Sequence, residues 1–194
     1  MSDSLSAAKE RIRREALGRR DAMPETRRIA AALAVADRVA ELDAPPGSTV
    51  SAYWPIRSEL DPRPLLFALH ERGCGMALPA VTARGMVFRE LTRTGDLEPA
   101  GFGTVAPPDG TPELVPDLIL LPLAAFDARG NRLGYGRGHY DGAIAALRVA
   151  GRAPRLVGLA FTLQRTGPIP AEAHDVPLDA ILTEAGLRPG AADA

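Results

Sequence analysis

The stretch DLILLPLAAFDARGNRLGYGRGHYD, residues 117–141, decides the fold because it holds an apolar run, a glycine-rich loop and the start of a helix. The apolar run, residues 118–121, ends at a proline, and its length and flank suit a buried strand better than a helix. Directly after the glycines comes a segment with helical apolar spacing, marked by Tyr140, Ile144 and Leu147. The stretch therefore predicts the order strand, glycine loop, helix.

The glycine loop is a candidate anion site. Gly134, Gly136 and Gly138 alternate with larger residues, and glycines let backbone N–H groups approach a phosphate closely. The unpaired N–H groups at the start of the following helix also favour negative charge. Arg132 and Arg137 add positive charge to the loop. A plain turn that only changes the chain direction is the alternative that these residues leave open.

The glycine spacing differs from two common nucleotide-binding motifs. The dinucleotide fingerprint is G-x-G-x-x-G with an acidic residue about 20 positions on, whereas this loop reads G-x-G-x-G and lacks that acid. A Walker A loop needs Gly-Lys-Ser/Thr, but the single lysine of the chain is Lys9. The spacing disfavours a nicotinamide oxidoreductase, and a phosphate bound here would be held in another way.

Ten consecutive residues of the stretch resemble a known signature. Residues 132–141 read R-L-G-Y-G-x-G-x-Y-D, preceded by Pro122 and by Ala-Phe-Asp at 125–127. They resemble the signature of the 5-formyltetrahydrofolate cyclo-ligase family, also called methenyltetrahydrofolate synthetases. Two other segments resemble the family in the right order, namely Lys9-x-x-x-Arg13, and Gln164 with the pattern I-P-x-E-x-H-D-x-x-x-D of residues 169–179. The resemblance covers nearly the whole chain.

Composition and charge narrow the classes of protein. A length of 194 residues and a formal net charge of −1 suit one soluble domain, residues 1–194. The near-neutral charge argues against a general nucleic-acid binder. The polar amino terminus and the lack of an apolar run of about 18 residues indicate neither export nor a membrane span, so we expect a cytoplasmic protein. Cys74 is the sole cysteine, which excludes an intrachain disulfide and a cysteine-based zinc site.

Two helices are predicted at the amino terminus, over residues 4–20 and 24–42. Lys9 and Arg13 lie four positions apart, hence on one side of the first helix, where both could reach one ligand. A solvated charged face is the alternative. With the family resemblance, we expect residues 1–44 to pack over the nucleotide site and Lys9 to contact ATP.

Strands and helices alternate along the rest of the chain, which predicts an α/β fold with a largely parallel central sheet. The family resemblance implies a three-layer architecture with a mixed sheet, similar to sugar-phosphate isomerases and CoA transferases. Residues 92–116 are rich in proline and glycine and are expected to form a long loop. The predicted strands are residues 49–54, 75–79, 86–91, 118–121, 155–161 and 180–183, and two further helices are expected near 62–71 and 140–150.

Glu59 lies in the loop after the first predicted strand, where parallel α/β sheets usually present functional groups. From the residues alone, Glu59 and Asp61 could equally be acids at the start of a helix. The resemblance implies that Glu59 contacts a pterin and that Trp54 makes an apolar contact with the substrate. Ala106 stands where the family usually has Glu or Gln, so a role carried by that side chain is in doubt.

The resemblance implies an enzyme that converts 5-formyltetrahydrofolate to 5,10-methenyltetrahydrofolate, with ATP as co-substrate and Mg²⁺ as the metal ion. ADP and phosphate would be released, and the route would pass through a phosphorylated formyl group. Lys9, Arg132 and Arg137 are the expected catalytic residues. The expected ATP-binding residues come from the first helix and the glycine loop, namely Lys9, Arg13, Arg132, Leu133, Gly134, Tyr135, Gly136, Arg137, Gly138, His139 and Tyr140.

Asp141 and Asp175 match the family's metal-binding positions, and carboxylates are suitable ligands for Mg²⁺. Taken separately, each could be a helix cap or an ion-pair partner. Tyr135 and His139 are expected to face the folate. The expected partners are small molecules rather than nucleic acid or a membrane, and the chain is expected to be a monomer. The main competing interpretation is a folate- or nucleotide-binding protein that has lost the chemistry.

Overall fold

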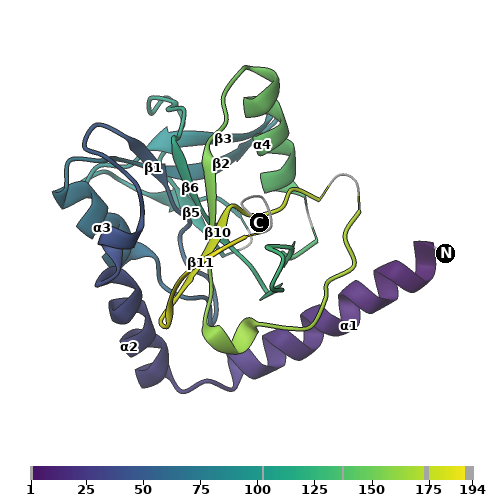
Figure 1. The fold of residues 1–194 in the computed structure, drawn as a ribbon. Coiled ribbons are helices and arrows are strands. Elements are labelled where there is room, and N and C mark those ends of the chain that lie inside the picture. The colour runs from purple at the N-terminus through teal and green to yellow at the C-terminus, as the bar shows by residue number, and fades with distance from the viewer. Residues whose placement is uncertain (1, 102, 137, 173–174, 191–194) are drawn as a thin grey trace.

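The computed structural model describes residues 2–101, 103–136, 138–172 and 175–190. A seven-stranded sheet in the order β11-β10-β9-β6-β1-β2-β3 forms its centre, and helices cover both faces (Figure 1). All neighbours from β10 to β2 are parallel, whereas β3 and β11 are antiparallel edge strands. This arrangement confirms the predicted α/β fold with a mixed, largely parallel sheet. The expected similarity to sugar-phosphate isomerases and CoA transferases stays a prediction.

The sheet strands are short, and the middle ones are buried. β6 has four fully enclosed residues and one partly enclosed proline, because β1 and β9 flank it and helices cover both of its faces. The predicted strand at 118–121 is therefore confirmed. The sheet comprises β1 (Thr49–Ser51), β2 (Gly75–Thr82), β3 (Gly85–Glu90), β6 (Leu118–Pro122), β9 (Arg155–Leu159), β10 (Ala180–Thr183) and β11 (Gly186–Pro189).

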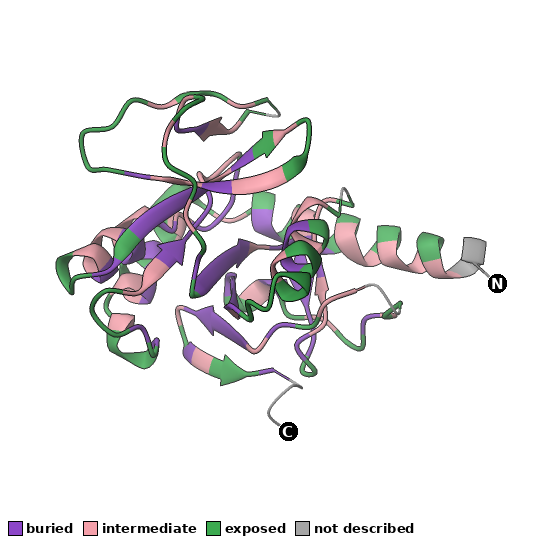
Figure 2. Ribbon diagram, turned by 90° about the horizontal axis from the view of Figure 1, so that it is seen from above, coloured by how far each residue is buried: buried purple, intermediate pink, exposed green. Residues whose placement is uncertain are grey.

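Over the described residues the α-helices are α1 (Ser2–Asp21), α2 (Glu25–Ala36), α3 (Arg63–Glu71) and α4 (His139–Val149). Apolar residues of α2 and α3 pack on one face of the sheet, and those of α4 pack on the other. Figure 2 shows the strands as mostly buried and α1 extending beyond the sheet with many exposed residues. The inner side of α1 contributes Ile12 and Ala16 to a small third cluster with Ala125, Leu133 and Ile169. None of the helices in the described ranges combines the length and apolar composition needed to span a bilayer.

Several predicted boundaries are wrong. β2 extends to Thr82 rather than residue 79, and β9 ends at Leu159 rather than residue 161. The second helix ends at Ala36 rather than residue 42, and a 3-10 turn, η1 (Val39–Glu41), follows it. There the Arg38 side chain donates to the carbonyl of Glu184, and Glu41 accepts from the N–H of Leu187, so this segment is bent to meet β11. The helical pattern is overridden by these contacts with the far end of the chain.

The first strand is also shorter than predicted, because it ends at Ser51 instead of residue 54. Ala52 still donates to the carbonyl of Ala77, but Tyr53 then turns inward and its hydroxyl donates to the carbonyl of Leu60 at 2.7 Å. Pro55 cannot donate a ladder hydrogen bond, so the chain leaves the sheet and forms the loop before α3.

The sequence patterns missed five short strands, which form one edge of the sheet and two ribbons. The edge strand β11 was not predicted, and the long loop contains a two-residue ribbon, β4 (Glu98–Pro99) with β5 (Val105–Ala106). Another ribbon, β7 (Ala125–Phe126) with β8 (Arg132–Leu133), separates β6 from the glycine loop. Strand, loop and helix thus follow in the predicted order, with a hairpin inserted between the first two.

Candidate active site

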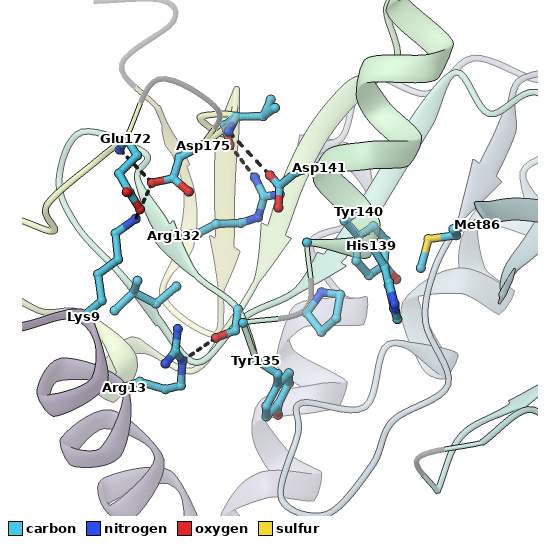
Figure 3. A pocket seen from close by; sticks show the side chains of 16 residues that line it. Lys9, Arg13, Met86, Arg132, Tyr135, His139, Tyr140, Asp141, Glu172 and Asp175 are labelled. Carbon is cyan, nitrogen blue, oxygen red and sulfur yellow. Dashed lines mark hydrogen bonds and ion pairs between the residues drawn. The ribbon is translucent and has the colours of Figure 1, made fainter. Parts of the chain in front are cut away.

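A cavity of about 480 Å³ opens where β6 ends, between α1, the glycine loop and the segment before β10 (Figure 3). This is the edge at which parallel strands usually present functional groups. Four residues of its wall were not predicted as site residues: Met86, Pro122, Glu172 and Val176. The predicted residues that line it are Lys9, Arg13, Arg132, Leu133, Gly134, Tyr135, Gly136, Gly138, His139, Tyr140, Asp141 and Asp175. The predicted Arg137 lies outside the described residues.

The hairpin before the glycine loop is held by the carboxylate of Asp127, which is buried. Its Oδ1 accepts from the N–H groups of Arg129 at 2.8 Å and Asn131 at 3.0 Å. Its Oδ2 accepts from the Asn131 side chain and from the N–H of Ile169, each at 2.9 Å. Asp127 thereby fixes both the turn of the hairpin and the segment that leads toward Asp175.

The glycine loop leads directly into α4. Gly136 has φ +83° and Gly138, which precedes the first helical residue, has φ +66°; side chains disfavour this left-handed region. The turn places the unpaired N–H groups of the first turn of α4 at the cavity, beginning with His139. The structure therefore has the loop-to-helix geometry that suits an anion.

Arg132 joins two sides of the cavity. Its side chain is 7% exposed, and its Nη2 donates to Oδ1 of Asp141 at 2.7 Å. Its Nη1 donates to the carbonyl of Val176, and the N–H of Val176 lies 3.5 Å from the same oxygen of Asp141. Arg132 therefore ties the first turn of α4 to the segment that carries Asp175.

Lys9 reaches the cavity from α1. Its Nζ lies 2.7 Å from Oε2 of Glu172 and 2.6 Å from Oδ2 of Asp175, and the lysine side chain is 12% exposed. Burial alone would lower the pKa of Lys9, but the hydrogen bonds and charges of the two carboxylates outweigh it and raise that pKa. The ammonium group of Lys9 is thus fixed by two carboxylates, and Lys9 is not part of a solvated charged face.

Arg13 lies one helical turn further along α1. Its Nε donates to the carbonyl oxygen of Gly134 at 2.8 Å, and its Nη1 pairs with Glu10. Lys9 and Arg13 therefore line the same cavity, as their spacing predicted, and α1 is bound directly to the glycine loop.

The two predicted metal ligands both line the cavity, and both carry hydrogen bonds to neighbouring cations. Oδ2 of Asp175 also accepts from the N–H of Glu172 at 2.8 Å. No cluster of three or more His, Cys, Asp or Glu side chains suited to a metal ion occurs within the described ranges. Two carboxylates still fit Mg²⁺, which commonly takes one or two of them and completes its shell with phosphate oxygens and water.

Glu59 and Trp54 lie outside the cavity wall. Glu59 is 8% exposed, and its Oε2 accepts from the N–H of Ile56 at 2.9 Å. Burial raises the pKa of Glu59, and its charge in turn helps to raise the pKa of Tyr135 and Tyr140, both of which line the cavity. Glu59 therefore lies behind the aromatic part of the cavity wall.

The two acids of this loop differ in role. Asp61 accepts from the N–H of Arg63, the first residue of α3, at 3.0 Å and pairs with its side chain, which fits the helix-start alternative. Glu59 has no such hydrogen bond to α3 within the described ranges, and its carboxylate interacts instead with the N–H of Ile56 and with Tyr135. The guanidinium of Arg63 also lies 5.0 Å from the ring centroid of Trp54, which is partly buried.

Figure 3 shows the cavity with two chemically different ends. The ionic end carries Lys9, Glu172 and Asp175, and the opposite end carries Met86, His139 and Tyr140. Glu172 belongs to the sequence pattern at 169–179, which was the only available signal for it. Met86 gave no signal, because nothing in its own strand predicts which loop lies opposite.

Comparisons with known proteins give one consistent result. The model of the 5-formyltetrahydrofolate cyclo-ligase family matches residues 5–184. The chain is similar to the 5-formyltetrahydrofolate cyclo-ligase of Mycolicibacterium smegmatis, at 33% identity over 188 residues, which cover 91% of this chain and 93% of that protein. It is also similar to the enzyme of the same name from Escherichia coli, at 30% identity over 70% of this chain and 77% of that protein.

Solved structures agree with the sequence comparisons. The 5,10-methenyltetrahydrofolate synthetase of Aquifex aeolicus matches with a TM-score of 0.75 and 27% identity, over 93% of this chain and 92% of that one. The 5,10-methenyltetrahydrofolate synthetase of Mycoplasma pneumoniae has the same fold, with a TM-score of 0.72 at 23% identity, over 91% of this chain and 98% of that one.

Proposed function

Because the chain belongs to the 5-formyltetrahydrofolate cyclo-ligase family, we propose that it closes 5-formyltetrahydrofolate into 5,10-methenyltetrahydrofolate while converting ATP to ADP and phosphate. One observation carries the proposal beyond family membership. The cations of α1, the start of α4 and two carboxylates meet at one cavity, as binding of Mg²⁺-ATP requires.

The reaction has a clear chemical difficulty, because a formamide carbon is a poor electrophile and its oxygen is a poor leaving group. In the proposed route the formyl oxygen attacks the γ-phosphorus, and the bond between that phosphorus and ADP breaks. The neighbouring folate N–H nitrogen then attacks the activated carbon, the carbon–oxygen bond breaks, and phosphate leaves together with the proton of that nitrogen. The protein's contribution is to position the two substrates and to stabilise charge on the transferred phosphoryl group.

The phosphates would bind at the ionic end of the cavity and along the glycine loop. The N–H groups at the start of α4 would donate to phosphate oxygens, and Lys9 and Arg13 would supply positive charge from α1. Arg132 is already hydrogen-bonded to Asp141, so in this proposal it holds that carboxylate in place and adds positive potential nearby. The role of Arg137 follows from the resemblance alone.

Asp141 and Asp175 would hold the Mg²⁺ ion together with phosphate oxygens. The metal would neutralise charge on the phosphates during transfer. Lys9 would then exchange its contact with Asp175 for a phosphate oxygen, and Glu172 would keep the ammonium group within reach. This exchange explains why one lysine can lie between a metal ligand and a second carboxylate.

The folate would occupy the end of the cavity that carries Met86, His139 and Tyr140, and its pterin would reach past Tyr135 to Glu59. A pterin ring presents neighbouring N–H donors, which match the two oxygens of a carboxylate such as Glu59. Trp54, which lies shortly before Glu59 in the sequence, would add an apolar contact with the folate. The monomeric state and the cytoplasmic location stay predictions from the sequence.

The test is a reconstituted assay with purified protein, 5-formyltetrahydrofolate, ATP and Mg²⁺, followed by the near-ultraviolet absorbance of the conjugated methenyl product. Product is expected only when both ATP and a divalent metal are present, because the weak oxygen nucleophile must attack a charge-shielded phosphorus. Product formed without ATP would refute the phosphorylated route. Tight binding of both substrates without turnover would favour the non-catalytic interpretation.

A further inference from the structure

Arg20, in the last turn of α1, is 1% exposed and is among the largest fully buried side chains of the described residues. A guanidinium in the interior is costly unless hydrogen bonds and nearby charge compensate for the lost hydration. Its neighbour Arg19 has an ordinary exposed position and donates to the carbonyl of Leu163 at 3.1 Å. The contrast indicates that Arg20 is buried because of specific interactions with the residues around it.

The neighbourhood of Arg20 consists of two loops of the proposed folate site. Its Nε donates to Oγ of Ser58 at 3.0 Å, and the hydroxyl of Ser58 donates to the carboxylate of Asp21. The guanidinium carbon lies 5.8 Å from the ring centroid of Tyr135, within the range of a cation–π contact. Arg20 therefore joins α1 to the loop of Glu59 and to the glycine loop.

The buried Glu59 and the buried hydroxyl of Tyr135 lie side by side near Arg20. Oε2 of Glu59 accepts from the N–H of Ile56. The hydroxyl of Tyr135 meets no group of the described residues at good hydrogen-bond geometry, but Glu59 and Arg20 are close enough to raise and to lower its pKa, respectively. The charged and titratable groups that act on Glu59 come from four elements: Arg20 from α1, Arg57 and Tyr53 from the loop after β1, Tyr135 from the glycine loop, and Tyr140 from α4.

Arg20 opposes the effect of burial on Glu59. Burial raises the pKa of Glu59, and the positive charges of Arg20 and Arg57 lower it. Arg57 is exposed to solvent, which screens its charge, whereas Arg20 is enclosed with the carboxylate. Arg20 is therefore the more effective of the two cations.

We infer that Arg20 is a positioning residue for the folate end of the cavity, where it holds the Tyr135 ring and the Ser58–Glu59 turn so that Glu59 is presented as an anion to the N–H donors of a pterin. The inference rests on the proposed function, in which Glu59 contacts the pterin. It assigns a site role to a residue that lies outside the cavity wall. If Arg20 were purely structural, replacing it would affect folding and would weaken the binding of both substrates alike.

The experiment compares Arg20→Gln, which keeps a donor for Ser58 but removes the charge, with Arg20→Lys, which keeps the charge. Arg19→Gln is the matched control on the same turn. Affinity for 5-formyltetrahydrofolate and for Mg²⁺-ATP is measured by calorimetry for each variant over a series of pH values that starts near the ordinary carboxyl pKa of about 4.3 and extends above neutrality. Binding is measured directly, so the result does not depend on turnover.

Arg20→Gln is expected to weaken folate binding about tenfold and to leave Mg²⁺-ATP binding unchanged. Without Arg20 the pKa of Glu59 rises further, so protonation sets in at higher pH, and the loss of folate affinity with falling pH is expected to begin at a higher pH than in the wild type. Arg20→Lys is expected to recover most of the affinity, and Arg19→Gln to match the wild type. In a Glu59→Gln background, Arg20→Gln is expected to cause no further loss, because its target is gone.

The outcomes separate the inference from the function it rests on. Unchanged folate binding in Glu59→Gln would overturn the pterin contact and the inference together. A second outcome is that Glu59→Gln weakens folate binding, but Arg20→Gln causes the same loss in the wild-type and in the Glu59→Gln background. That outcome would overturn the inference and leave the pterin contact standing. Should Arg20→Gln fail to fold, Ser58→Ala removes the acceptor for Nε together with the donor to Asp21 and leaves Arg20 in place. A loss confined to folate then supports the inference, whereas no loss or a loss for both substrates contradicts it.

Discussion

The ammonium nitrogen of Lys9 lies 2.6 Å from Oδ2 of Asp175, although 166 positions separate the two residues in the chain. The contact closes α1 over the cavity and places the only lysine of the sequence beside a proposed metal ligand. The proposed catalytic cation and a proposed metal ligand thus hold each other in place in this structure.

Replacing Lys9 by alanine is expected to reduce kcat/KM for ATP about ten- to a hundredfold, because a hydrogen bond to a charged group contributes about 1.5–3 kcal/mol. The unfolding free energy should change by about 1 kcal/mol or less, since Glu172 and Asp175 are partly exposed and can be hydrated once the lysine is lost. Initial rates and urea denaturation measure the two effects.

The matched control is Arg11→Ala on the same helix, which removes an exposed cation paired with Glu15. It should leave both the rate and the unfolding free energy close to those of the wild type. Equal activity in wild type and Lys9→Ala would mean that the contact with Asp175 is only structural.

Asp141→Asn is expected to raise the Mg²⁺ concentration needed for half-maximal rate by about tenfold or more, because a metal site loses affinity when a charged ligand becomes neutral. Saturating Mg²⁺ should restore part of the rate. The measurement is the initial rate against Mg²⁺ concentration. Asp109→Asn, which breaks an Asp–Arg pair on the surface with Arg89, controls for the loss of an ion pair. A lowered rate with an unchanged Mg²⁺ dependence would exclude Asp141 as a metal ligand.

Glu59→Gln is expected to change the pH dependence of stability. Burial raises the pKa of Glu59 in the folded state above its ordinary value of 4.5. The folded protein therefore binds the proton more tightly than the unfolded chain does, and the stability that Glu59 contributes is present below about pH 4.5 and lost as the pH rises through the folded pKa. As the pH rises, the unfolding free energy of the wild type should fall relative to that of Glu59→Gln, by about 1.4 kcal/mol in total for each unit by which folding raises the pKa of Glu59.

Urea denaturation of both proteins at several pH values tests this expectation. The difference in unfolding free energy between wild type and Glu59→Gln should fall with rising pH and then become constant. A difference that grows with pH would show that the folded state favours the ionised carboxylate.

Gly158→Ala is expected to destabilise the fold by about 1–3 kcal/mol through overpacking. A Cβ at this position of β9 would lie 2.6 Å from Cδ1 of Leu178 and 2.7 Å from Cδ2 of Leu123, both of them buried. Gly142→Ala in α4 is the control, because its Cβ would meet open space and alanine favours a helix by about 1 kcal/mol. Chemical denaturation should therefore show opposite signs for the two variants.

The parts of the fold that depend on local pattern were predictable. The apolar run of β6, the cationic side of α1 and the turn into α4 follow from residue type and spacing, and each appears in the structure. Boundaries that depend on distant partners were not predictable. The second helix gives way to η1 because Arg38 and Glu41 contact residues near the far end of the chain.

The candidate site shows the same division. The spacing of Lys9 and Arg13 indicated a shared ligand, but their contacts with Asp175 and Gly134 require the folded chain. Arg20 has a charged neighbour on each side in sequence, and such a run ordinarily indicates a solvated surface. Its burial depends on Ser58 and Tyr135, which no local pattern connects to α1.

The closure of α1 by Lys9 has a consequence for the order in which the protein is made. α1 is synthesised well before its partners, because its contacts with η2 (Thr162–Gln164), Glu172 and Asp175 need residues that lie far behind it in the sequence. At elongation rates of about 5–20 residues per second, the 166 positions between Lys9 and Asp175 correspond to roughly 10–30 s. During that time a nascent chain carries Lys9 without its two carboxylate partners, and the ionic end of the cavity is completed only after Asp175 has been made.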